Sequence, residues 1–362
     1  MFTENISTQG FRSLQLHQKT FSKKINVFCG NNNAGKTSIL EALFFCSNLK
    51  SFKSVPNNEL INNLSDSFKI SVNFIKKNVN YNIFVEKSLK SSKVTLNSKK
   101  ISKANLLLSY PCYCLVFGFN NILLNESSYR RDFIDSGMFH VEQGSYAAVK
   151  KFEKTLKQRN FLLKSQNTGD LAFWDKELID SNLVLSQYRN EYFSSLNTQF
   201  LTILDKLSAS GEKIYKDILS LSMDYDVGWP DGDYTLSLSK NLKKDLAVGH
   251  TSCGTHRSDF IIKSNNKPVK ESASMSTLVL ASLVLHLAKI NLFHVKHGYK
   301  PLLLIDDLFF GIDNKNLNTV IKLLVSSDSN IMLTAPNMYK GVLLELCDKY
   351  KDIEVIDMES KI

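Results

Sequence analysis

The sequence predicts an α/β protein: a nucleotide-binding head that contains a mixed sheet with an antiparallel β layer, and a helical arm inserted into that head. Three observations support this fold class. A glycine-containing loop at residues 30–37 lies between an apolar run and a helical pattern. Runs that alternate apolar and polar residues follow it over residues 68–96. Two long stretches then place apolar residues at helical spacing over residues 145–164 and 174–207.

The loop fits the pattern G-x-x-x-x-G-K-[ST] of a phosphate-binding P-loop. Its flanks fit as well, because Ile25–Cys29 reads as a buried strand and Ser38–Phe45 as a helix; a chance match would leave these flanks unexplained. In such a loop, backbone N–H groups and the helix dipole hold the phosphates of ATP, and the lysine reaches the β- and γ-phosphates. The residues expected to bind ATP are Gly30, Asn31, Asn32, Asn33, Ala34, Gly35, Lys36 and Thr37, and the hydroxyl of Thr37 is also expected to bind Mg²⁺.

The N-terminal part of the head, residues 1–118, is predicted to consist largely of strands around this loop. Two or three short strands precede the P-loop, among them Phe11–Leu16 after a turn at Gly10. After the P-loop helix, Lys and Asn turns separate short alternating runs, which indicates an antiparallel meander. The strands of the meander and the buried strand after it are expected at Phe68–Phe74, Tyr81–Val85, Val94–Leu96 and Tyr113–Phe117.

Residues 119–245 are predicted to form the inserted, mainly helical arm. Ser145–Lys164 and Trp174–Leu207 read as two helices that pair in antiparallel fashion, with apolar residues on one side and lysines on the other. The segment lacks the sustained heptads of a long coiled-coil stalk. Lys157 and Arg159 are expected on the polar face of the first helix, where they either contact DNA or are simply solvated.

Residues 246–362 are predicted to complete the head. Four apolar residues, Leu302–Ile305, end in Asp306 and Asp307, as in a Walker B strand. A buried parallel strand of this kind brings its C-terminal carboxylate to the nucleotide edge of the sheet. We therefore expect Asp306 to bind Mg²⁺ and Asp307 to orient or deprotonate the attacking water; two acids in an ordinary strand-end turn are the alternative. The other expected elements are an apolar helix at Met275–Leu292, a core strand at Asn330–Thr334 and an edge strand or cap at Ile353–Ile362.

The composition indicates a soluble, cytoplasmic protein without a membrane partner. The formal net charge is +10 and the pI about 9.1, which suits an anionic partner such as nucleic acid without requiring one. The six cysteines have no metal-ligand spacing and read as reduced thiols. No signal sequence is evident, and we expect no apolar run long enough to span a membrane.

Several sequence blocks outside the P-loop resemble those of RecF, a bacterial recombination mediator and a compact relative of the SMC and Rad50 ATPase heads. The likeness extends almost from end to end, and the blocks LKQRN, WDKEL and GTHRSD are more specific than the widely shared Walker motifs. The blocks lie at residues 10–12, 50–54, 129–135, 139–140, 156–160, 174–178, 254–259 and 304–307.

The resemblance implies an ABC-type ATPase head that binds ATP and Mg²⁺ and dimerises head to head on ATP binding. Each nucleotide would lie between the P-loop of one subunit and the signature motif of the other, to which Ser274 would belong, and Asp313 would be the D-loop residue at the dimer interface. RecF-like proteins bind gapped or junction DNA and act with RecO and RecR to load recombinase at single-strand gaps and stalled forks. These properties imply a part in DNA replication, repair and the SOS response to DNA damage.

The chain departs from the family pattern in two places that bear on hydrolysis. Asn33 replaces a glycine of the P-loop, but Asn tolerates the left-handed backbone conformation better than other non-glycine residues. The family's Ser-x-Gly-Gln aligns with Ser274–Thr277, so its glycine and glutamine are both missing, and no histidine follows Thr334 at the switch position. We therefore expect weak hydrolysis, and we expect dimer formation on ATP to be weakened as well.

Two classes of function remain open at this point. The first is a slow, DNA-dependent ATPase that acts as a DNA-repair clamp and uses ATP as a switch. The second is a DNA-binding scaffold that binds ATP but hydrolyses it negligibly. For Arg130 and Arg131, a helix-surface pair and a nucleotide- or lobe-contact site are equally open, and for His256 and Arg257 a position near the nucleotide or DNA is favoured over a structural one.

Overall fold

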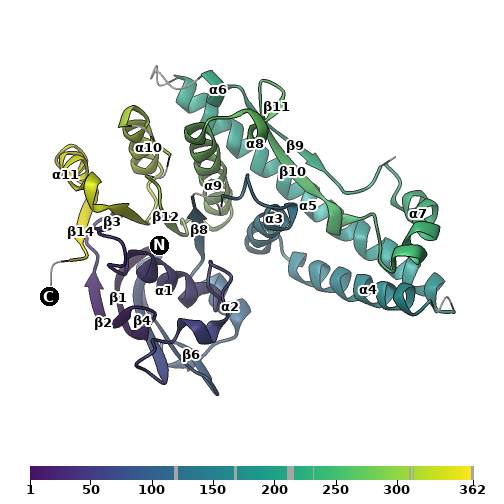
Figure 1. Ribbon diagram of the computed structural model, residues 1–362, viewed down its shortest axis with the longest axis horizontal. Coiled ribbons are helices and arrows are strands. Elements are labelled where there is room, and N and C mark those ends of the chain that lie inside the picture. The colour runs from purple at the N-terminus through teal and green to yellow at the C-terminus, as the bar shows by residue number, and fades with distance from the viewer. Residues whose placement is uncertain are drawn as a thin grey trace. The chain divides into compact units, whose positions relative to one another are not determined.

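The computed structural model describes residues 1–117, 121–166, 169–209, 216–230, 232–309, 311–312 and 314–359. Contacts within the chain divide it into two compact units (Figure 1). Unit 1 comprises Met1–Asn121 and Phe293–Ile362, and unit 2 comprises Ile122–Leu292. Unit 2 ends at Leu292, whereas the arm was expected to end at residue 245. The strand at residues 259–264 pairs with the strand at residues 221–226, and Lys289 of the helix that follows donates a hydrogen bond to Phe133 of unit 2.

Unit 1 contains a five-stranded parallel sheet that carries the P-loop. Its strands Ile25–Gly30 and Leu302–Asp306 are mostly apolar and buried at every position, which is the pattern of a sheet covered on both faces. The expected strands at Ile25–Cys29, Tyr113–Phe117, Leu302–Asp306 and Asn330–Thr334, and the C-terminal edge strand, are confirmed with small changes of bounds. In spatial order they are β14 (Ile353–Asp357), β3 (Ile25–Gly30), β13 (Ile331–Pro336), β12 (Leu302–Asp306) and β8 (Cys112–Val116).

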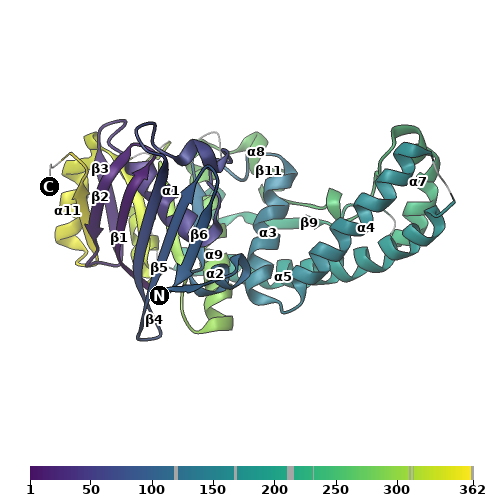
Figure 2. The ribbon, with the colours of Figure 1, turned by 90° about the horizontal axis from the view of Figure 1, so that it is seen from below.

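A six-stranded antiparallel sheet forms the second β layer of unit 1, as Figure 2 shows. The expected meander is confirmed. The expected single strand at Phe11–Leu16 is wrong: Phe11 pairs with Leu14 across a tight turn, and Arg12 in that turn has a φ of 52°. In spatial order the strands are β2 (Leu14–Thr20), β1 (Phe2–Phe11), β4 (Ser67–Lys76), β5 (Val79–Ser88), β6 (Ser92–Leu96) and β7 (Lys99–Lys100).

The helix after the P-loop, α1 (Lys36–Asn48), lies in the hydrophobic core that the two sheets share. Ile39, Leu40 and Leu43 are fully buried in one cluster with residues of both sheets, such as Ile70 and Leu304. The apolar residues of α1, which recur every three or four positions, thus hold the helix against the core with its N-terminus at the P-loop. The other helices of unit 1 are the short η1 (Asn57–Leu60), α2 (Lys103–Ser109), α10 (Asn314–Ser326), η4 (Asn337–Tyr339) and α11 (Lys340–Lys349).

Unit 2 is built on the expected antiparallel helix pair, α4 (Ser145–Ser165) and α5 (Leu171–Ala209), which lie side by side in both views (Figures 1 and 2). The buried hydroxyls of Thr155 and Ser181 join them at 2.8 Å. The unit is less purely helical than predicted, since it also holds a three-stranded sheet. Its remaining elements are α3 (Ser127–Val141), α6 (Lys216–Leu219), β9 (Leu221–Asp226), α7 (Tyr234–Val248), η3 (Thr255–Arg257), β10 (Asp259–Ser264), β11 (Lys267–Pro268), α8 (Val269–Ser272) and most of α9 (Met275–His297).

Helix α9 corrects the expectation that no apolar run reaches membrane-spanning length. Its 23 residues, with a mean hydropathy of 1.8 in the most apolar window, are long and apolar enough to cross a membrane. However, 83% of that window is buried inside the fold. This burial is the property of a core helix, whose apolar residues are covered by protein.

Candidate nucleotide-binding site

The P-loop adopts the sharp strand-to-helix turn that its sequence predicts. Gly35 precedes α1 with a φ of 86°, and a Cβ atom at this position would lie 2.8 Å from Cδ2 of Leu14, so only glycine fits without rearrangement. Asn33 has a φ of 68°, which confirms that the residue in place of the family glycine accepts a left-handed conformation. The loop and the first turn of α1 can therefore present backbone N–H groups to an anion.

Two charged side chains contact the backbone of the loop, one from the loop itself and one from the C-terminal end of the chain. The Nζ atom of Lys36 donates to the carbonyl oxygens of Gly30 at 2.8 Å and Asn31 at 2.7 Å. From the other end of the chain, a carboxylate oxygen of Glu359 accepts a hydrogen bond of 2.7 Å from the backbone N–H of Asn31. The loop thus already holds an anionic group, which sequence reasoning did not foresee because nothing in the local pattern places residue 359 there.

Asp306 is the centre of a polar cluster where β12, β13 and α1 meet. One of its carboxylate oxygens accepts hydrogen bonds from Oγ1 of Thr37 at 3.0 Å and from Oγ1 of Thr334 at 2.9 Å. The side chain is 3% exposed, and this burial raises the pKa of Asp306, with a further contribution from the charge of Asp307. The two residues predicted to hold Mg²⁺ are therefore adjacent, and their hydroxyl and carboxylate oxygens are ligands that Mg²⁺ prefers.

Asp307 differs from Asp306 in its exposure and backbone. It is exposed, its φ is 59°, and its backbone N–H donates to Oγ1 of Thr334 at 2.9 Å. Thr334 thus contacts both acids, although it was not among the predicted site residues. The signal was its position at the end of the strand NIMLT, which in a parallel sheet comes to the same edge as the end of β12.

A second polar cluster fixes the back of the P-loop helix. The guanidinium of Arg12 forms two hydrogen bonds of 2.9 Å to the carboxylate of Glu41, which is 2% exposed, and Oγ of Ser51 also donates to Glu41. Two blocks that carried the family resemblance, residues 10–12 and 50–54, therefore meet on α1. A cavity of about 650 Å³ next to Arg12 is lined also by Ser13, Ser38, Glu59, Ile61, Asn62, Asn63 and Leu64, and its size is that of a small-ligand pocket.

Two residues, Ser274 and Asp313, were predicted to complete the nucleotide site of a second subunit. Oγ of Ser274 accepts a hydrogen bond of 3.2 Å from the backbone N–H of Thr277 and lies 3.0 Å from its hydroxyl, so Ser274 caps the start of α9. Asp313 lies outside the described residues. Among the residues that are described, no group of three or more His, Cys, Asp or Glu side chains could hold a metal ion by itself.

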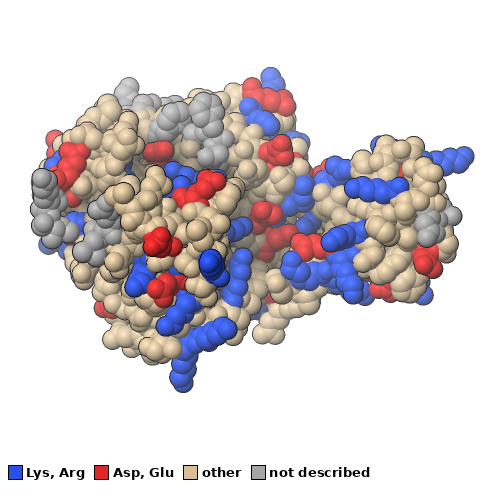
Figure 3. Space-filling view, turned by 60° about the horizontal axis from the view of Figure 1, so that its bottom comes forward, with Lys and Arg blue, Asp and Glu red and all other residues tan. Residues whose placement is uncertain are grey.

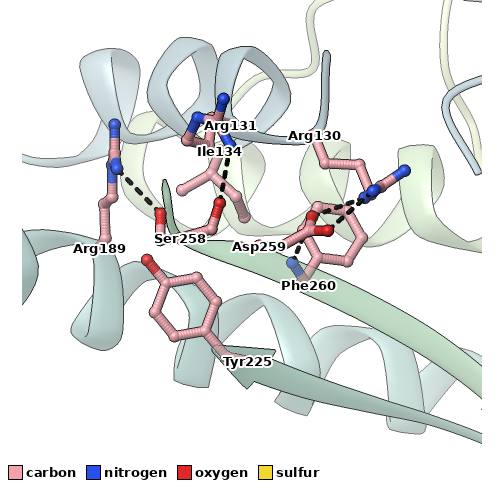
Figure 4. A pocket seen from close by; sticks show the side chains of 8 residues that line it. All are labelled: Arg130, Arg131, Ile134, Arg189, Tyr225, Ser258, Asp259 and Phe260. Carbon is pink, nitrogen blue, oxygen red and sulfur yellow. Dashed lines mark hydrogen bonds and ion pairs between the residues drawn. The ribbon is translucent and has the colours of Figure 1, made fainter. Parts of the chain in front are cut away.

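The arginines of the block at residues 129–135 form an internal brace of unit 2 (Figure 4). Arg130 forms hydrogen bonds of 2.6 and 2.8 Å to the carboxylate of Asp259, and Arg131 donates to the carbonyl oxygen of Ser258 at 2.9 Å. Arg189 of α5 donates to the hydroxyl of Ser258 at 3.0 Å. These contacts tie α3 and α5 to the start of β10, which favours a structural role for the arginine pair.

The predicted DNA-contact residues separate into one exposed and one buried side chain. Lys157 is exposed on α4. Arg159 is 0% exposed, and its guanidinium bonds to Asp175 at 2.6 Å and to Asp245 at 2.8 Å. The expectation that Arg159 lies on the polar face and contacts DNA is therefore wrong, because its position two turns from Phe152 places it on the buried stripe of the helix.

His256 is also structural in this fold. Its Nε2 atom lies 3.0 Å from the carbonyl oxygen of Thr251 and its ring stacks on Phe152 at a centroid distance of 6.1 Å. Burial lowers the pKa of His256 to about 4, so the ring is neutral at physiological pH. The neighbouring Arg257 is exposed. The GTHRSD block thus shapes the loop before β10 rather than presenting a histidine cation.

The six cysteines are free thiols, as the sequence indicated. Burial raises the pKa of Cys112 and Cys114, which keeps these thiols protonated and unreactive.

A P-loop, an acidic strand end beside it and a helix between a parallel and an antiparallel sheet define the class of this protein as a P-loop ATPase head of the ABC type. The chain belongs to the AAA domain family, whose model matches residues 5–246.

Within that family the chain is similar to RecF over nearly its whole length. It is 27% identical over 339 residues to the DNA replication and repair protein RecF of Shewanella denitrificans, and the match covers 92% of both chains. It is 28% identical over 334 residues to the protein of the same name from Shewanella sp. strain MR-4, with 91% of both chains covered. The resemblance that the sequence blocks indicated is confirmed.

Solved structures agree on the fold. A structure of the recombination mediator protein RecF with ATP, from the RecFOR pathway, superimposes with a TM-score of 0.76 at 22% identity, with 92% of both chains covered. The Smc head domain of Pyrococcus furiosus, with an extended coiled coil and bound to the C-terminal domain of ScpA, gives a TM-score of 0.56 at 15% identity, with 99% of this chain and 94% of that chain covered. At these identities the structures support the fold class alone.

Proposed function

We propose that this chain is a RecF-like recombination mediator that binds ATP with Mg²⁺ and uses it as a switch for a DNA-binding clamp. The observation that carries the proposal is the junction of Thr37, Asp306 and Thr334 at the P-loop, which joins residues from three elements into one polar site. The similarity to RecF proteins over 92% of the chain supports the biological role in DNA replication and repair. Such a protein acts in the cytoplasm and binds gapped or junction DNA.

Each predicted site residue of the P-loop and of the acidic strand end has a role in this proposal. Lys36 and the loop amides bind the phosphates, and Thr37 and Asp306 hold Mg²⁺, which neutralises phosphate charge when bound. Asp307, exposed beside Asp306, orients or deprotonates the attacking water. Hydrolysis is slow, because Ser276 and Thr277 replace the family's glycine and glutamine.

The active form is a dimer assembled on ATP. Each nucleotide lies between the P-loop of one subunit and Ser274 and Asp313 of the other, and the dimer works with RecO and RecR to load recombinase at single-strand gaps and stalled forks. The test is light scattering coupled to size exclusion, with and without ATP, on the wild type and on Asp307→Asn. ATP is expected to convert monomer to dimer, and Asp307→Asn is expected to prolong the dimer. The exposed Asp352→Asn serves as the control, and a chain that stays monomeric with ATP in both variants contradicts the proposal.

The second candidate is a DNA-binding scaffold that binds ATP and hydrolyses it negligibly. The capping role of Ser274, whose Oγ is engaged by Thr277, favours it. Steady-state phosphate release with and without gapped DNA separates the two candidates. Release that DNA stimulates and that Lys36→Ala abolishes supports the switch, whereas ATP binding without measurable release supports the scaffold.

A further inference from the structure

The antiparallel sheet of unit 1 has one face buried and one face open. On the buried face, Ile6, Val72 and Ile83 lie in one cross-strand row and contact the core around α1. Because successive side chains of a strand point to opposite sides, the residues between them form the outer face. Figure 2 views the sheet from this side, and none of the described helices lies in front of β4 and β5. The outer face is therefore available to a partner.

Lysine dominates the edge of this sheet. Residues 87–103, which include β6 and β7, contain six lysines and no Asp or Glu. Lys90, Lys93, Lys99 and Lys100 are all exposed, and within the described residues no ion pair joins any of them to an acid. Lysine and arginine side chains are likewise visible over the lower part of unit 1 in Figure 3. A run with this charge density is a candidate for binding a polyanion.

The strand register places Lys93 and Lys100 on the outer face, and Lys90 lies in the turn between β5 and β6. Lys69, Glu86 and Lys93 lie in one row across β4, β5 and β6, and Lys69 forms an ion pair of 3.7 Å with Glu86. Lys100 pairs with Thr95, two residues beyond Lys93, so Lys93 and Lys100 are diagonal neighbours about 7–8 Å apart. Glu86 is thus paired with Lys69. The Nζ atom of Lys93 lies 5.9 Å from the ring centroid of Phe84, a contact that leaves its charge in place, so Lys93 and Lys100 both keep their charge for a partner.

Apart from Phe84, which pairs with Ser71 and Thr95, most of the rest of the outer face is polar and uncharged. Asn73 donates to Asn5 at 2.9 Å, and Asn82 donates to Asn73 at 2.7 Å, so a row of amides crosses the same face of the sheet, on the far side of Phe84 from Lys93. Asn and Ser side chains are regular partners of phosphate and sugar oxygens. The neighbouring outer-face residues are Asn5, Ser7, Gln9, Ser71, Asn73 and Asn82.

We propose that this outer face, centred on Lys93 and Lys100 and continued by Lys90 in the adjoining turn, binds the phosphate backbone of DNA; the inference rests on the DNA-binding function proposed above. One strand of a duplex carries a negative charge about every 3.4 Å of helix axis, so lysines about 7–8 Å apart reach separate phosphates. The neutral row of amides continues the contact without reading the base sequence. This surface lies on the head and is distinct from Lys157 of the arm.

The test compares two triple variants with equal changes of charge. Lys90→Gln/Lys93→Gln/Lys100→Gln removes the charges of the outer face and of the adjoining turn, and Lys23→Gln/Lys349→Gln/Lys351→Gln removes exposed charges elsewhere in unit 1. The affinity of the full-length chain for a fluorescent duplex with a single-stranded gap is measured over a series of NaCl concentrations. Each lost phosphate contact lowers the slope of log K against log salt by about 0.9, so the outer-face variant is expected to lose about two to three from the slope. The control variant is expected to lose much less.

The outcomes are distinct. If the wild type binds no DNA, the proposed function fails and this inference fails with it. If the wild type binds and both triple variants keep its slope, the inference alone is overturned. Lysines on an edge strand also discourage pairing with another chain. Suppose that the outer-face variant self-associates in sedimentation but keeps the wild-type slope of log K against log salt. This result would show that the lysines only prevent the edge strand from pairing with another chain, and it would likewise overturn the inference.

Discussion

The hydroxyl of Thr37 lies 3.0 Å from the carboxylate of Asp306, although 269 residues separate the two in sequence. One residue opens α1 and the other ends β12, so the contact requires that the P-loop helix and the acidic strand reach the same edge of the sheet. Thr334 completes the contact from the neighbouring strand at 2.9 Å. In the function that we propose, this cluster holds the magnesium ion.

Replacing Asp306 by Asn is expected to abolish the dependence of ATP binding on Mg²⁺ while raising the temperature of unfolding. Burial raises the pKa of Asp306, which means that the fold disfavours its charged form, and Asn removes that charge. Isothermal titration with and without Mg²⁺ and a thermal melt measure both effects. In the wild type, Mg²⁺ binding should weaken on acidification at a higher pH than for an ordinary carboxylate, because the raised pKa protonates Asp306 earlier. Retention of the magnesium effect in Asp306→Asn contradicts this role.

Replacing Glu359 by Gln is expected to tighten ATP binding. The carboxylate accepts the N–H of Asn31 at 2.7 Å, so its negative charge lies on the loop that must receive phosphates. Removing this exposed like charge should lower Kd by about two- to fivefold at low salt, with a smaller effect at high salt. Glu354→Gln, in the strand β14 that precedes Glu359, is the control. Equal Kd values for wild type and Glu359→Gln would show that the carboxylate does not compete with phosphate.

Replacing Arg159 by Met is expected to destabilise the chain by about 3–5 kcal/mol, because Asp245 is buried and would lose its charged partner. The exposed Lys157→Met on the same helix is the matched control and should change stability by about 0.5 kcal/mol or less. Urea unfolding monitored by circular dichroism gives both values. A stable Arg159→Met chain that specifically loses DNA affinity would contradict the structural assignment.

Lys289 is expected to make the stability of unit 2 depend on pH. Its Nζ atom is buried and donates to the carbonyl oxygen of Phe133 at 2.9 Å and to Oγ of Ser136 at 2.7 Å, and burial lowers the pKa of Lys289 to about 7 despite the charges of Asp135 and Asp132. The unfolded chain, with a lysine pKa of about 10.4, binds more protons between about pH 7 and pH 10. Stability should therefore rise with pH across that window, by up to about 1.4 kcal/mol per pH unit.

The variant Lys289→Met tests this linkage. Its unfolding free energy, measured by urea titration from pH 7 to pH 10, should lack the Lys289 contribution to the slope. Lys270→Met, which alters an exposed lysine of the same unit, should keep the slope of the wild type. The slope is the informative quantity, since the substitution also removes two hydrogen bonds. Parallel pH profiles for Lys289→Met and wild type would contradict the assignment.

The sequence by itself determined the P-loop, the acidic strand and the antiparallel meander. Each of these is a local pattern: a fixed glycine spacing, a continuous apolar run that ends in acids, or a period of two. The same local information allowed Asn33 to be assigned a left-handed backbone, which its φ of 68° bears out. The burial of Arg159 could also have been found, since it follows Phe152 and Thr155 at helical spacing.

Only the tertiary structure decided which distant residues meet. The contacts of Thr334 with Asp306, of Glu359 with Asn31 and of Arg12 with Glu41 join separate elements, and no periodicity along the chain specifies them. The placement of Lys93 and Lys100 on one face likewise depends on strand register, because a shift of one residue would turn both to the other side. Local patterns fix the elements, whereas packing and register fix the side chains that they bring together.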